Sequence, residues 1–213
     1  MDYIEENIKQ YRKKNEIYGN GAPENLWRRK ESQVRRFKKF LDLLDFTNQI
    51  ILDVGCGYGD FYYFLIENGI VPKQYIGCDL MPEHCRVALE RLPKDCQIIE
   101  GDFLQVSLPK VDIAILSGTL NAEFENWEAV STSIIDKMWQ FSKIGICFNM
   151  QSSHGLSGEY KEQVNKYRNI APAFWVSYAH KKTCRYGLYH DYMHYDYTIG
   201  MWKAENEWQE SNA

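Results

Sequence analysis

Short apolar runs alternate with amphipathic helical patterns along most of this chain. Runs of four to eight apolar, β-branched residues are typical of buried strands, whereas apolar residues that recur every three to four positions indicate helices. The strands are predicted at 50–53, 74–80, 97–100, 111–117 and 143–150, and the helices at 61–66, 83–92 and 127–141. Strands that alternate with helices favour a parallel sheet with helices packed on it.

Two later runs, at 186–189 and 195–202, are also rich in residues that favour strands. The residues between them, 190–194, are long enough for a hairpin loop, so the two runs are expected to pair antiparallel. The segment at about 152–182 before them is polar and rich in charges. We interpret this segment as an insertion on the substrate side of the sheet.

The first 45 residues are predicted to form a helical cap. Residues 1–20 form a helical stripe, either a lid or an ordinary packed helix, and a second helix is expected from about Pro23 to Leu44. One face of this second helix is apolar and the other is basic, with Arg28, Arg29, Lys30, Arg35, Arg36, Lys38 and Lys39. A charged face is often merely solvated. The planar fork of arginine also suits a carboxylate or phosphate, which makes Arg36 a candidate for binding an anion.

The most distinctive stretch is 50–61, with the sequence IILDVGCGYGDF. A predicted strand ends in Asp53, and three glycines follow at alternate positions. Glycine permits positive φ, and because it has no Cβ it lets the backbone approach a ligand closely. A carboxylate at the end of a strand, in the crevice of an open α/β sheet, is placed to hold a polar group of a ligand. The dinucleotide fingerprint fits less well, because its third glycine position is Asp60 here.

The pattern Asp-x-Gly-x-Gly-x-Gly in "LDVGCGYGDF" resembles the first motif of the class I methyltransferases, which use S-adenosylmethionine. The resemblance covers about residues 45–203. It implies an α/β fold: a three-layer αβα sandwich with a mostly parallel seven-stranded sheet whose last strand is antiparallel. It also implies a helical cap at 1–45, a methyltransferase domain at 46–213, S-adenosyl-L-methionine as the cofactor and S-adenosyl-L-homocysteine as its product.

Acids recur at the ends of the next two strands, at Asp79 and Asp102. A carboxylate has two acceptor oxygens, so Asp79 suits the two hydroxyls of a ribose. In the family that the chain resembles, an acid at the place of Asp102 accepts a hydrogen bond from the adenine amino group, and the next side chain packs near the ring. The predicted cofactor-binding residues are Asp53, Gly55, Cys56, Gly57, Asp79, Leu80, Asp102, Phe103, Ser117, Gly118 and Arg36.

Composition and charge narrow the class of protein. The 213 residues are 45% hydrophobic, enough for one domain with a large core, and the net charge of −4 makes a nucleic-acid partner unlikely. No apolar run approaches the length of a membrane span, and the N-terminus is not a signal peptide. The six cysteines form no Cys-x-x-Cys pair, so neither a metal site nor a disulfide framework is indicated. We therefore expect a cytoplasmic protein without a membrane partner, either a monomer or a homodimer.

The absence of certain motifs narrows the class of molecule that can be the methyl acceptor. After the fourth strand the chain has Ser117-Gly-Thr-Leu-Asn121, not the Asp/Asn-Pro-Pro-aromatic turn of enzymes that methylate amino groups of bases or of glutamine. We therefore expect a small metabolite or biosynthetic intermediate as the acceptor, methylated on oxygen or, second, on an amine nitrogen. His190 and His154 are the candidate general bases, because histidine titrates in the right range. Asn121 is a third candidate catalytic residue.

Two other functions remain open from the sequence. The first is an RNA or protein methyltransferase that docks its target through the basic helix at 28–39. The second is a non-catalytic partner subunit that binds the cofactor and scaffolds another chain. Salt-sensitive binding to an anionic target would favour the first, and cofactor binding without methyl transfer would favour the second.

Overall fold

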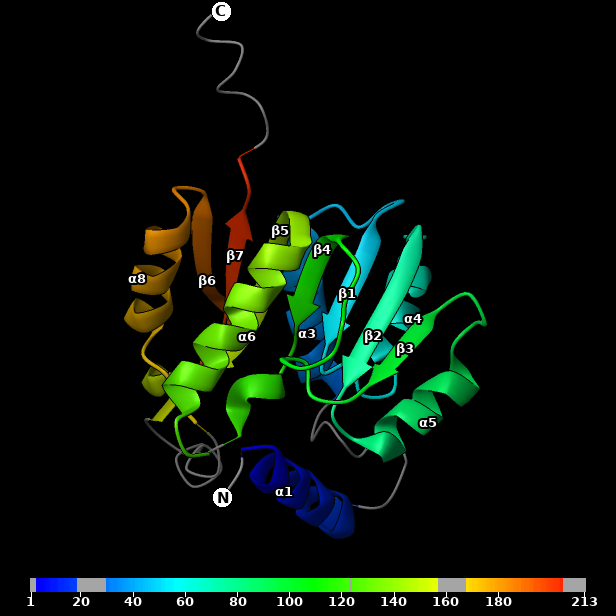
Figure 1. Ribbon diagram of the computed structural model, residues 1–213. Coiled ribbons are helices and arrows are strands. Elements are labelled where there is room, and N and C mark those ends of the chain that lie inside the picture. The colour runs from blue at the N-terminus through cyan, green and yellow to red at the C-terminus, as the bar shows by residue number, and fades with distance from the viewer. Residues whose placement is uncertain (1–2, 19–29, 123, 157–167, 205–213) are drawn as a thin grey trace, which may run out of the picture.

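A seven-stranded sheet forms the centre of the protein (Figure 1). The computed structural model describes residues 3–18, 30–122, 124–156 and 168–204. The strands are β1 (Ile50–Val54), β2 (Gln74–Asp79), β3 (Gln97–Glu100), β4 (Val111–Leu116), β5 (Ser142–Gln151), β6 (Tyr186–Met193) and β7 (Asp196–Trp202). The α-helices are α1 (Tyr3–Tyr18), α3 (Lys30–Leu43), α4 (Asp60–Glu67), α5 (Pro82–Arg91), α6 (Trp127–Phe141) and α8 (Pro172–Lys182), and the short 3-10 helices are η1 (Thr119–Asn121) and η2 (Ser153–Leu156).

The strand order across the sheet is β3-β2-β1-β4-β5-β7-β6. The first five strands run parallel, and β7 pairs antiparallel with both β5 and β6. The predicted αβα sandwich with an antiparallel last strand is therefore confirmed. The strand order reverses between β1 and β4, and ligands of open α/β sheets bind at such a switch point, outside the carboxyl ends of the strands.

Each face of the sheet buries its own hydrophobic cluster, because successive side chains of a strand point to opposite faces. Leu52 of β1 faces the cluster that contains Ile135 of α6. Ile51 faces the other cluster, with Phe40 of α3 and Phe61 of α4. Figure 1 shows the resulting layers, with α6 and α8 in front of the sheet and α3 behind it. Among the described residues, no helix is both long and apolar enough to cross a membrane.

The hairpin differs from its prediction. Strand β6 continues to Met193, so His190 lies within the strand, and the turn is at His194 and Tyr195. The loop predicted at 190–194 is therefore wrong. The pairing with β7 is irregular between Tyr189 and Met193, and β6 is the edge strand of the sheet. Edge strands tolerate polar residues and bulges, and this is why the polar sequence of 190–192 resembled a loop.

The segment expected as an insertion contains η2 and α8. The side chains of Trp175 and Ala179 in α8 are fully buried in the cluster that α6 also joins, so α8 belongs to the helical layer of the sheet. Residues 157–167, together with Arg28 and Arg29 of the basic face, lie outside the described residues. The division into a cap at 1–45 and a domain at 46–213 stays a prediction.

Candidate functional site

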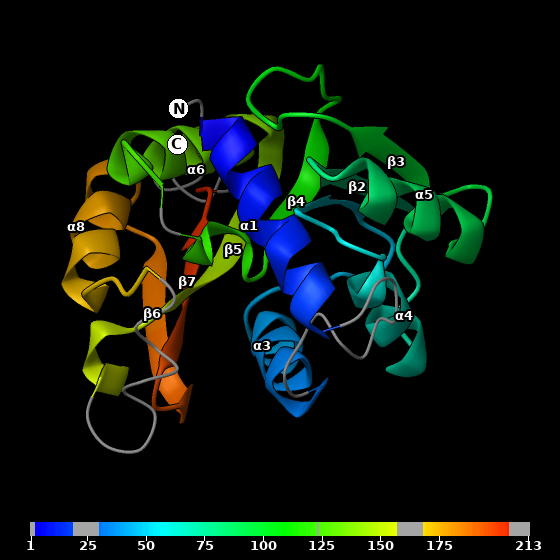
Figure 2. The same ribbon diagram turned by 90° about the horizontal axis from the view of Figure 1, so that it is seen from below.

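Helix α1 lies across the edge of the sheet where the strands end, as Figure 2 shows. Near its start, the hydroxyl of Tyr3 donates a hydrogen bond to Asp102 Oδ1, and the Tyr3 ring lies 5.9 Å from that of Phe124. Further along, Arg12 Nη2 lies 3.2 Å from Glu83 Oε1 of α5. These contacts tie α1 to the segment after β4 and to the start of α5, on both sides of the switch point.

The glycine turn after β1 serves two different purposes. Gly55 has φ +73°, and a Cβ on it would lie 2.0 Å from Thr119 Oγ1 of η1, which in turn bonds to the carbonyl oxygen of Val54. Gly57 has φ +55°, and a Cβ there would meet nothing within 4 Å. Gly55 is therefore required by packing within the protein, whereas Gly57 borders open space that a ligand can enter.

Asp79 closes β2 beside this turn. Its Oδ2 accepts a hydrogen bond from the backbone N–H of Gly57 at 2.8 Å, and its Oδ1 accepts one from the N–H of Met81 at 2.9 Å. The Nδ1 atom of the buried His84 side chain lies 3.2 Å from the same Oδ1. These bonds fix the carboxylate against the glycine turn, and His84 is a neighbour that the sequence interpretation missed.

Asp102 follows β3 at the same edge. Besides Tyr3, its Oδ1 accepts a hydrogen bond from the backbone N–H of Leu104 at 3.0 Å. Its Oδ2 is buried and has no hydrogen-bond partner in the described part of the chain. Phe103 is buried in the core cluster of α6, and Lys137 Nζ lies 5.3 Å from the centre of its ring.

Asp53, the acid of the glycine motif, is almost fully buried, with 4% of its surface exposed. Its Oδ2 accepts a hydrogen bond of 2.5 Å from the hydroxyl of Tyr75 in β2. The pKa of Asp53 is raised to about 7 as the net result of burial, which raises it, the bond from Tyr75, which lowers it, and the nearby Asp79 and Asp60 carboxylates, which raise it. The carboxyl group therefore changes its charge near neutral pH.

The loop after β4 is held by Asn149, a fully buried residue of β5. Its Nδ2 donates to Ser117 Oγ at 3.0 Å, and its Oδ1 accepts from the backbone N–H of Gly118 at 2.9 Å. Asn121, a candidate catalytic residue, accepts a hydrogen bond on its Oδ1 from the N–H of Gln151 at 3.3 Å. The structure thus gives Asn121 a bond to the β5 backbone, and its catalytic role stays a prediction.

Arg36 of α3 contacts the β6–β7 hairpin. Its Nε donates a 2.7 Å hydrogen bond to Asp196 Oδ2 at the start of β7, and both side chains are buried. Burial raises the pKa of Asp196, while Arg36 and the hydroxyl of Tyr192 oppose that shift. The contact fixes α3 to the hairpin. A role of Arg36 in binding the cofactor stays a prediction.

The two candidate general bases do come together. The rings of His154 in η2 and His190 in β6 lie with their centroids 6.1 Å apart. His190 Nε2 lies 3.1 Å from the carbonyl oxygen of His194. A carbonyl only accepts, so Nε2 carries the proton of this bond and, in the neutral ring, Nδ1 carries the lone pair.

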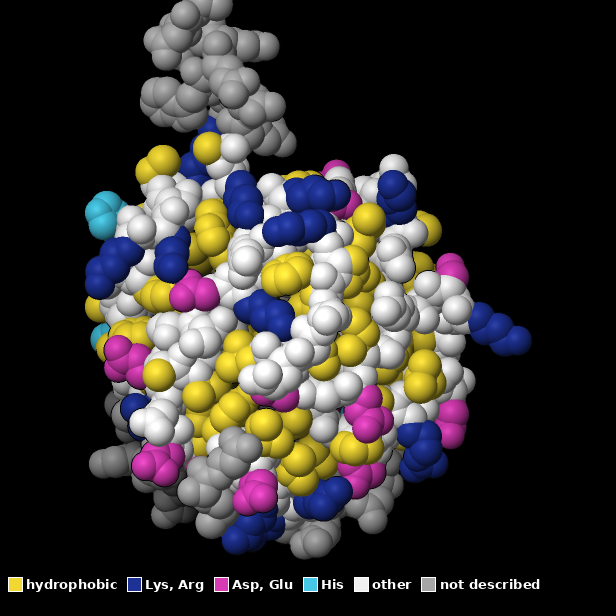
Figure 3. All heavy atoms as spheres, in the orientation of Figure 1, with side chains coloured by type: hydrophobic (Ala, Val, Ile, Leu, Met, Phe, Trp, Pro, Cys, Tyr) yellow, Lys and Arg dark blue, Asp and Glu magenta, His cyan; other side chains and the backbone are white. Residues whose placement is uncertain are grey.

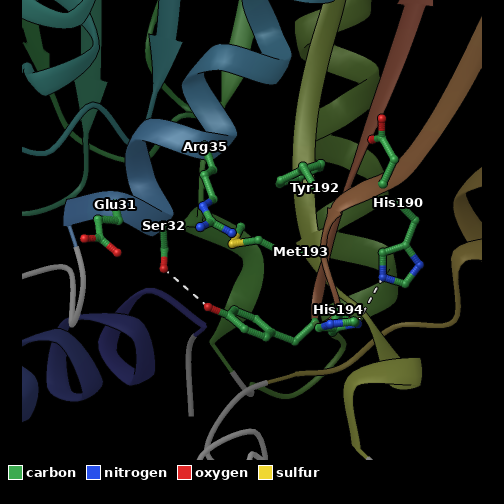
Figure 4. Close-up of a pocket in the computed structure, with 9 residues that line it drawn as sticks. Glu31, Ser32, Arg35, His190, Tyr192, Met193 and His194 are labelled. Carbon is green, nitrogen blue, oxygen red and sulfur yellow. Dashed lines mark hydrogen bonds between the residues drawn. The ribbon is translucent and has the colours of Figure 1, made fainter.

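A pocket of about 290 Å³ opens beside these residues, between α3 and the β6–β7 hairpin (Figure 4). It is lined by Glu31, Ser32, Arg35, His190, Asp191, Tyr192, Met193, His194 and Tyr195. The hydroxyls of Ser32 and Tyr195 lie 3.3 Å apart across the gap, and Asp191 pairs with Lys39 at 3.1 Å. The pocket is therefore polar, and arginine, imidazole and hydroxyl groups line it.

The residues at the carboxyl edge fit an adenosyl cofactor. The space beside Gly57 admits a ligand next to the backbone, and the unpaired Oδ2 of Asp102 is an acceptor of the kind that an exocyclic amino group satisfies. Cys56 is buried beneath the turn and Leu80 is partly exposed behind Asp79. The roles of the individual cofactor-site residues stay predictions, but their arrangement suits the expected ligand.

Comparisons with known proteins agree with this geometry. Residues 51–138 match the family described as "Methyltransferase domain". The magnesium protoporphyrin IX methyltransferase from Synechocystis PCC 6803 with bound SAH has a TM-score of 0.63 at 16% identity, over 93% of this chain and 96% of that one. The PH0226 protein from Pyrococcus horikoshii OT3 has a TM-score of 0.67 at 15% identity, over 92% and 99%. Human N-acetylserotonin methyltransferase in complex with SAM has a TM-score of 0.59 at 16% identity, over 78% and 51%.

The matched family spans the glycine turn, the acids at the ends of β2 and β3, and the serine after β4. At these low identities the solved structures establish the fold, and the family match adds the activity and with it S-adenosylmethionine as the cofactor. Residues 51–138 are therefore a methyltransferase domain, and the chain is an S-adenosylmethionine-dependent enzyme of the class I fold.

Proposed function

We propose that this enzyme transfers the methyl group to a small-molecule acceptor, on oxygen or, second, on an amine nitrogen. The observation that carries the proposal is the polar pocket between α3 and the β6–β7 hairpin, at the edge where the strands end. Pockets for small ligands start at about 300 Å³, so a volume of about 290 Å³ suits a compact metabolite.

S-adenosylmethionine, when bound, supplies a methyl group that is already electrophilic. The protein then has to align the acceptor atom and exclude water from the site. In the proposed arrangement Ser32, Tyr195 and Arg35 orient the acceptor through their polar groups. Their places on α3 and on the hairpin turn, around one cavity, support this assignment.

A hydroxyl acceptor has to lose its proton during the transfer, and His190 or His154 would take it. Both lie near the pocket, and the bond from Nε2 of His190 to the backbone leaves Nδ1 as its basic nitrogen. An amine acceptor that is already neutral needs less help from a base. Methylation of a hydroxyl acceptor should therefore depend more strongly on these histidines than methylation of an amine acceptor.

The test measures S-adenosylhomocysteine formation with panels of small hydroxyl and amine compounds, of short RNAs and of peptides. We expect turnover with a small molecule, and a loss of about 10²-fold in His190→Gln for a hydroxyl acceptor. His180→Gln is the matched control, because His180 lies on α8 and contacts Tyr186. Turnover only with RNA or a peptide would contradict the proposal. Equal activity of the two histidine variants on a hydroxyl acceptor would exclude His190 as the base and leave His154.

The docking of RNA or protein through the basic helix has less support. Arg36 is buried in its pair with Asp196, and Lys39 pairs with Asp42 and Asp191, so these cations are engaged within the protein. Figure 3 shows lysine and arginine side chains gathered at the upper edge of the molecule, opposite α1. Lys110 precedes β4 and Lys203 follows β7, and the pKa of Lys203 is lowered by burial and by Lys110. Both residues are therefore at the amino edge of the parallel strands, whereas the proposed acceptor pocket is at the β6–β7 turn, at the opposite edge.

The proposal includes a cytoplasmic location and no nucleic-acid or membrane partner. All six cysteines are free, and five of them are buried or half-buried. A protein with this many free thiols suits a reducing compartment. Size-exclusion chromatography with light scattering would decide between a monomer and a homodimer.

A further inference from the structure

The acid of the glycine motif has a partner that the motif does not predict. In the register of β1 and β2, Tyr75 lies beside Ile51, and Gly77 lies beside Asp53. Residues two apart on a strand share a face, about 6.6 Å from each other. The tyrosine side chain spans this distance and brings its hydroxyl to 2.5 Å from Asp53 Oδ2.

This pair is sealed from water. Tyr75 is 1% exposed and Asp53 is 4% exposed. The ring of Tyr62 packs edge-on against Tyr75, with the centroids 5.4 Å apart, and holds it in place. A single strong hydrogen bond in such surroundings determines where the carboxyl group points and how readily it ionises.

The other groups that act on Asp53 do not favour its charge. They are the carboxylates of Asp79 on β2 and Asp60 on α4, and the thiols of Cys56 in the turn and Cys147 on β5. No cation is among them in the part of the chain that the structure describes. Burial and these acids raise the pKa of Asp53, Tyr75 is the group that lowers it, and the net value is about 7.

We propose that Tyr75 is a positioning residue for the cofactor, because its hydroxyl aims the Asp53 carboxylate and keeps it ionised for the α-ammonium group of the cofactor, which S-adenosylhomocysteine also carries. The inference rests on the proposed function only in that the cofactor binds beside Asp53. Binding of the cationic group then drives the loss of one proton from the neutral Asp53 fraction to solvent. No bond to carbon or sulfur changes in this step.

The proton balance gives a number to measure. With a pKa near 7, about half of the Asp53 carboxyl groups are protonated at pH 7, so binding of S-adenosylhomocysteine releases about half a proton per site. At pH 8.5 the release falls to almost zero. Calorimetry in buffers with different ionisation enthalpies measures this release directly.

Tyr75→Phe is the decisive variant, since it removes only the hydroxyl. Loss of the hydrogen bond from the Tyr75 hydroxyl to the ionised carboxylate would raise the pKa of Asp53 by about one unit. S-adenosylhomocysteine then binds about fivefold more weakly than to the wild type at pH 7, and within about twofold at pH 8.5. A purely structural defect would weaken binding equally at both pH values and would overturn the inference.

Tyr62→Phe is the matched control, because Tyr62 packs on the same ring but makes no bond to Asp53. It should keep the wild-type pH profile. Carbon-detected NMR of the cofactor-free protein measures the pKa of the Asp53 carboxyl group. This pKa should be higher than in the wild type for Tyr75→Phe and unchanged for Tyr62→Phe. A wild type that binds no S-adenosylhomocysteine at any pH would refute the proposed function and this inference together. Normal wild-type binding with an unchanged Tyr75→Phe profile would refute the inference alone.

Discussion

The buried ion pair between α3 and the hairpin gives a prediction whose size follows from the structure. Arg36 and Asp196 are joined at 2.7 Å, with side-chain exposures of 5% and 0%. Asp196 also accepts a hydrogen bond from the hydroxyl of Tyr192 at 2.7 Å. Removing one partner of such a pair costs about 3–5 kcal/mol, because the remaining charge is left buried. We expect Arg36→Met to lower the free energy of unfolding at pH 7 by about this amount.

The loss should depend on pH with a definite sign. Burial raises the pKa of Asp196 even beside Arg36, and without the cation this pKa rises further. A carboxyl pKa that is higher in the folded state lowers the free energy of unfolding at every pH above the pKa of the unfolded state, about 3.9. This loss of stability grows with pH up to the folded-state pKa. Each pH unit in that window corresponds to about 1.4 kcal/mol, so lowering the pH from 7 to 5 should restore up to about 2.7 kcal/mol.

Urea unfolding at pH 5 and pH 7 measures both effects. Arg35→Met is the matched control, because Arg35 lies one residue earlier on α3 and is exposed; it should change stability by no more than about 0.5 kcal/mol. The double variant Arg36→Met/Asp196→Asn removes both charges and should recover most of the loss. A drop below about 1 kcal/mol in Arg36→Met, or no recovery in the double variant, would refute the reasoning. If the double variant also keeps its affinity for S-adenosylhomocysteine, the predicted role of Arg36 in cofactor binding is wrong.

Three further outcomes follow from single contacts. Gly57→Ala should lower the free energy of unfolding by about 1 kcal/mol, because the residue has a positive φ, and should weaken the calorimetric affinity for S-adenosylhomocysteine at least about tenfold. Gly69 has φ +75° and equally open space, so Gly69→Ala should show the loss of stability alone. Asn149→Leu strands the N–H of Gly118 and should lower the urea-derived free energy of unfolding by about 2–4 kcal/mol. The stability of Asp53→Asn relative to the wild type should rise by about 1.4 kcal/mol per pH unit from pH 5 to pH 7, because the unfolded wild type is ionised there while the folded Asp53, with a pKa of about 7, keeps its proton. A flat difference in urea titrations would contradict this.

The cofactor half of the fold was predictable because its signals are local. Strand β1, the glycine turn and the start of α4 are neighbours in sequence, and the apolar run, the glycines and the acid each specify their own backbone. The acids of β2 and β3 repeat that arrangement, and parallel strands bring their ends to one edge. The strands were therefore predicted to within a few residues before any register was known.

The partners of these residues were not predictable, since each pair joins distant positions. Tyr75 reaches Asp53 across two paired strands, whose register places Tyr75 beside Ile51, and no local pattern encodes a register. The pair of Arg36 with Asp196 joins the first helix of the core to its last strand. The sequence shows a basic face on α3, but it does not show which cation turns inward.

The same distinction explains why the cofactor is easier to infer than the acceptor. The predicted cofactor site consists mainly of backbone and carboxylates that the strand ends present in a fixed order, so its signature is a compact motif. The proposed acceptor pocket is built from side chains of α3 and of the β6–β7 hairpin, which are more than 150 residues apart in the chain. Those side chains can change without disturbing the sheet, because β6 is an edge strand and α3 holds its place through the buried pair of Arg36 and Asp196. A fold organised in this way can keep its cofactor while it changes its acceptor, and the identity of the acceptor must therefore be sought in residues such as Arg35 and Tyr195 rather than in the glycine motif.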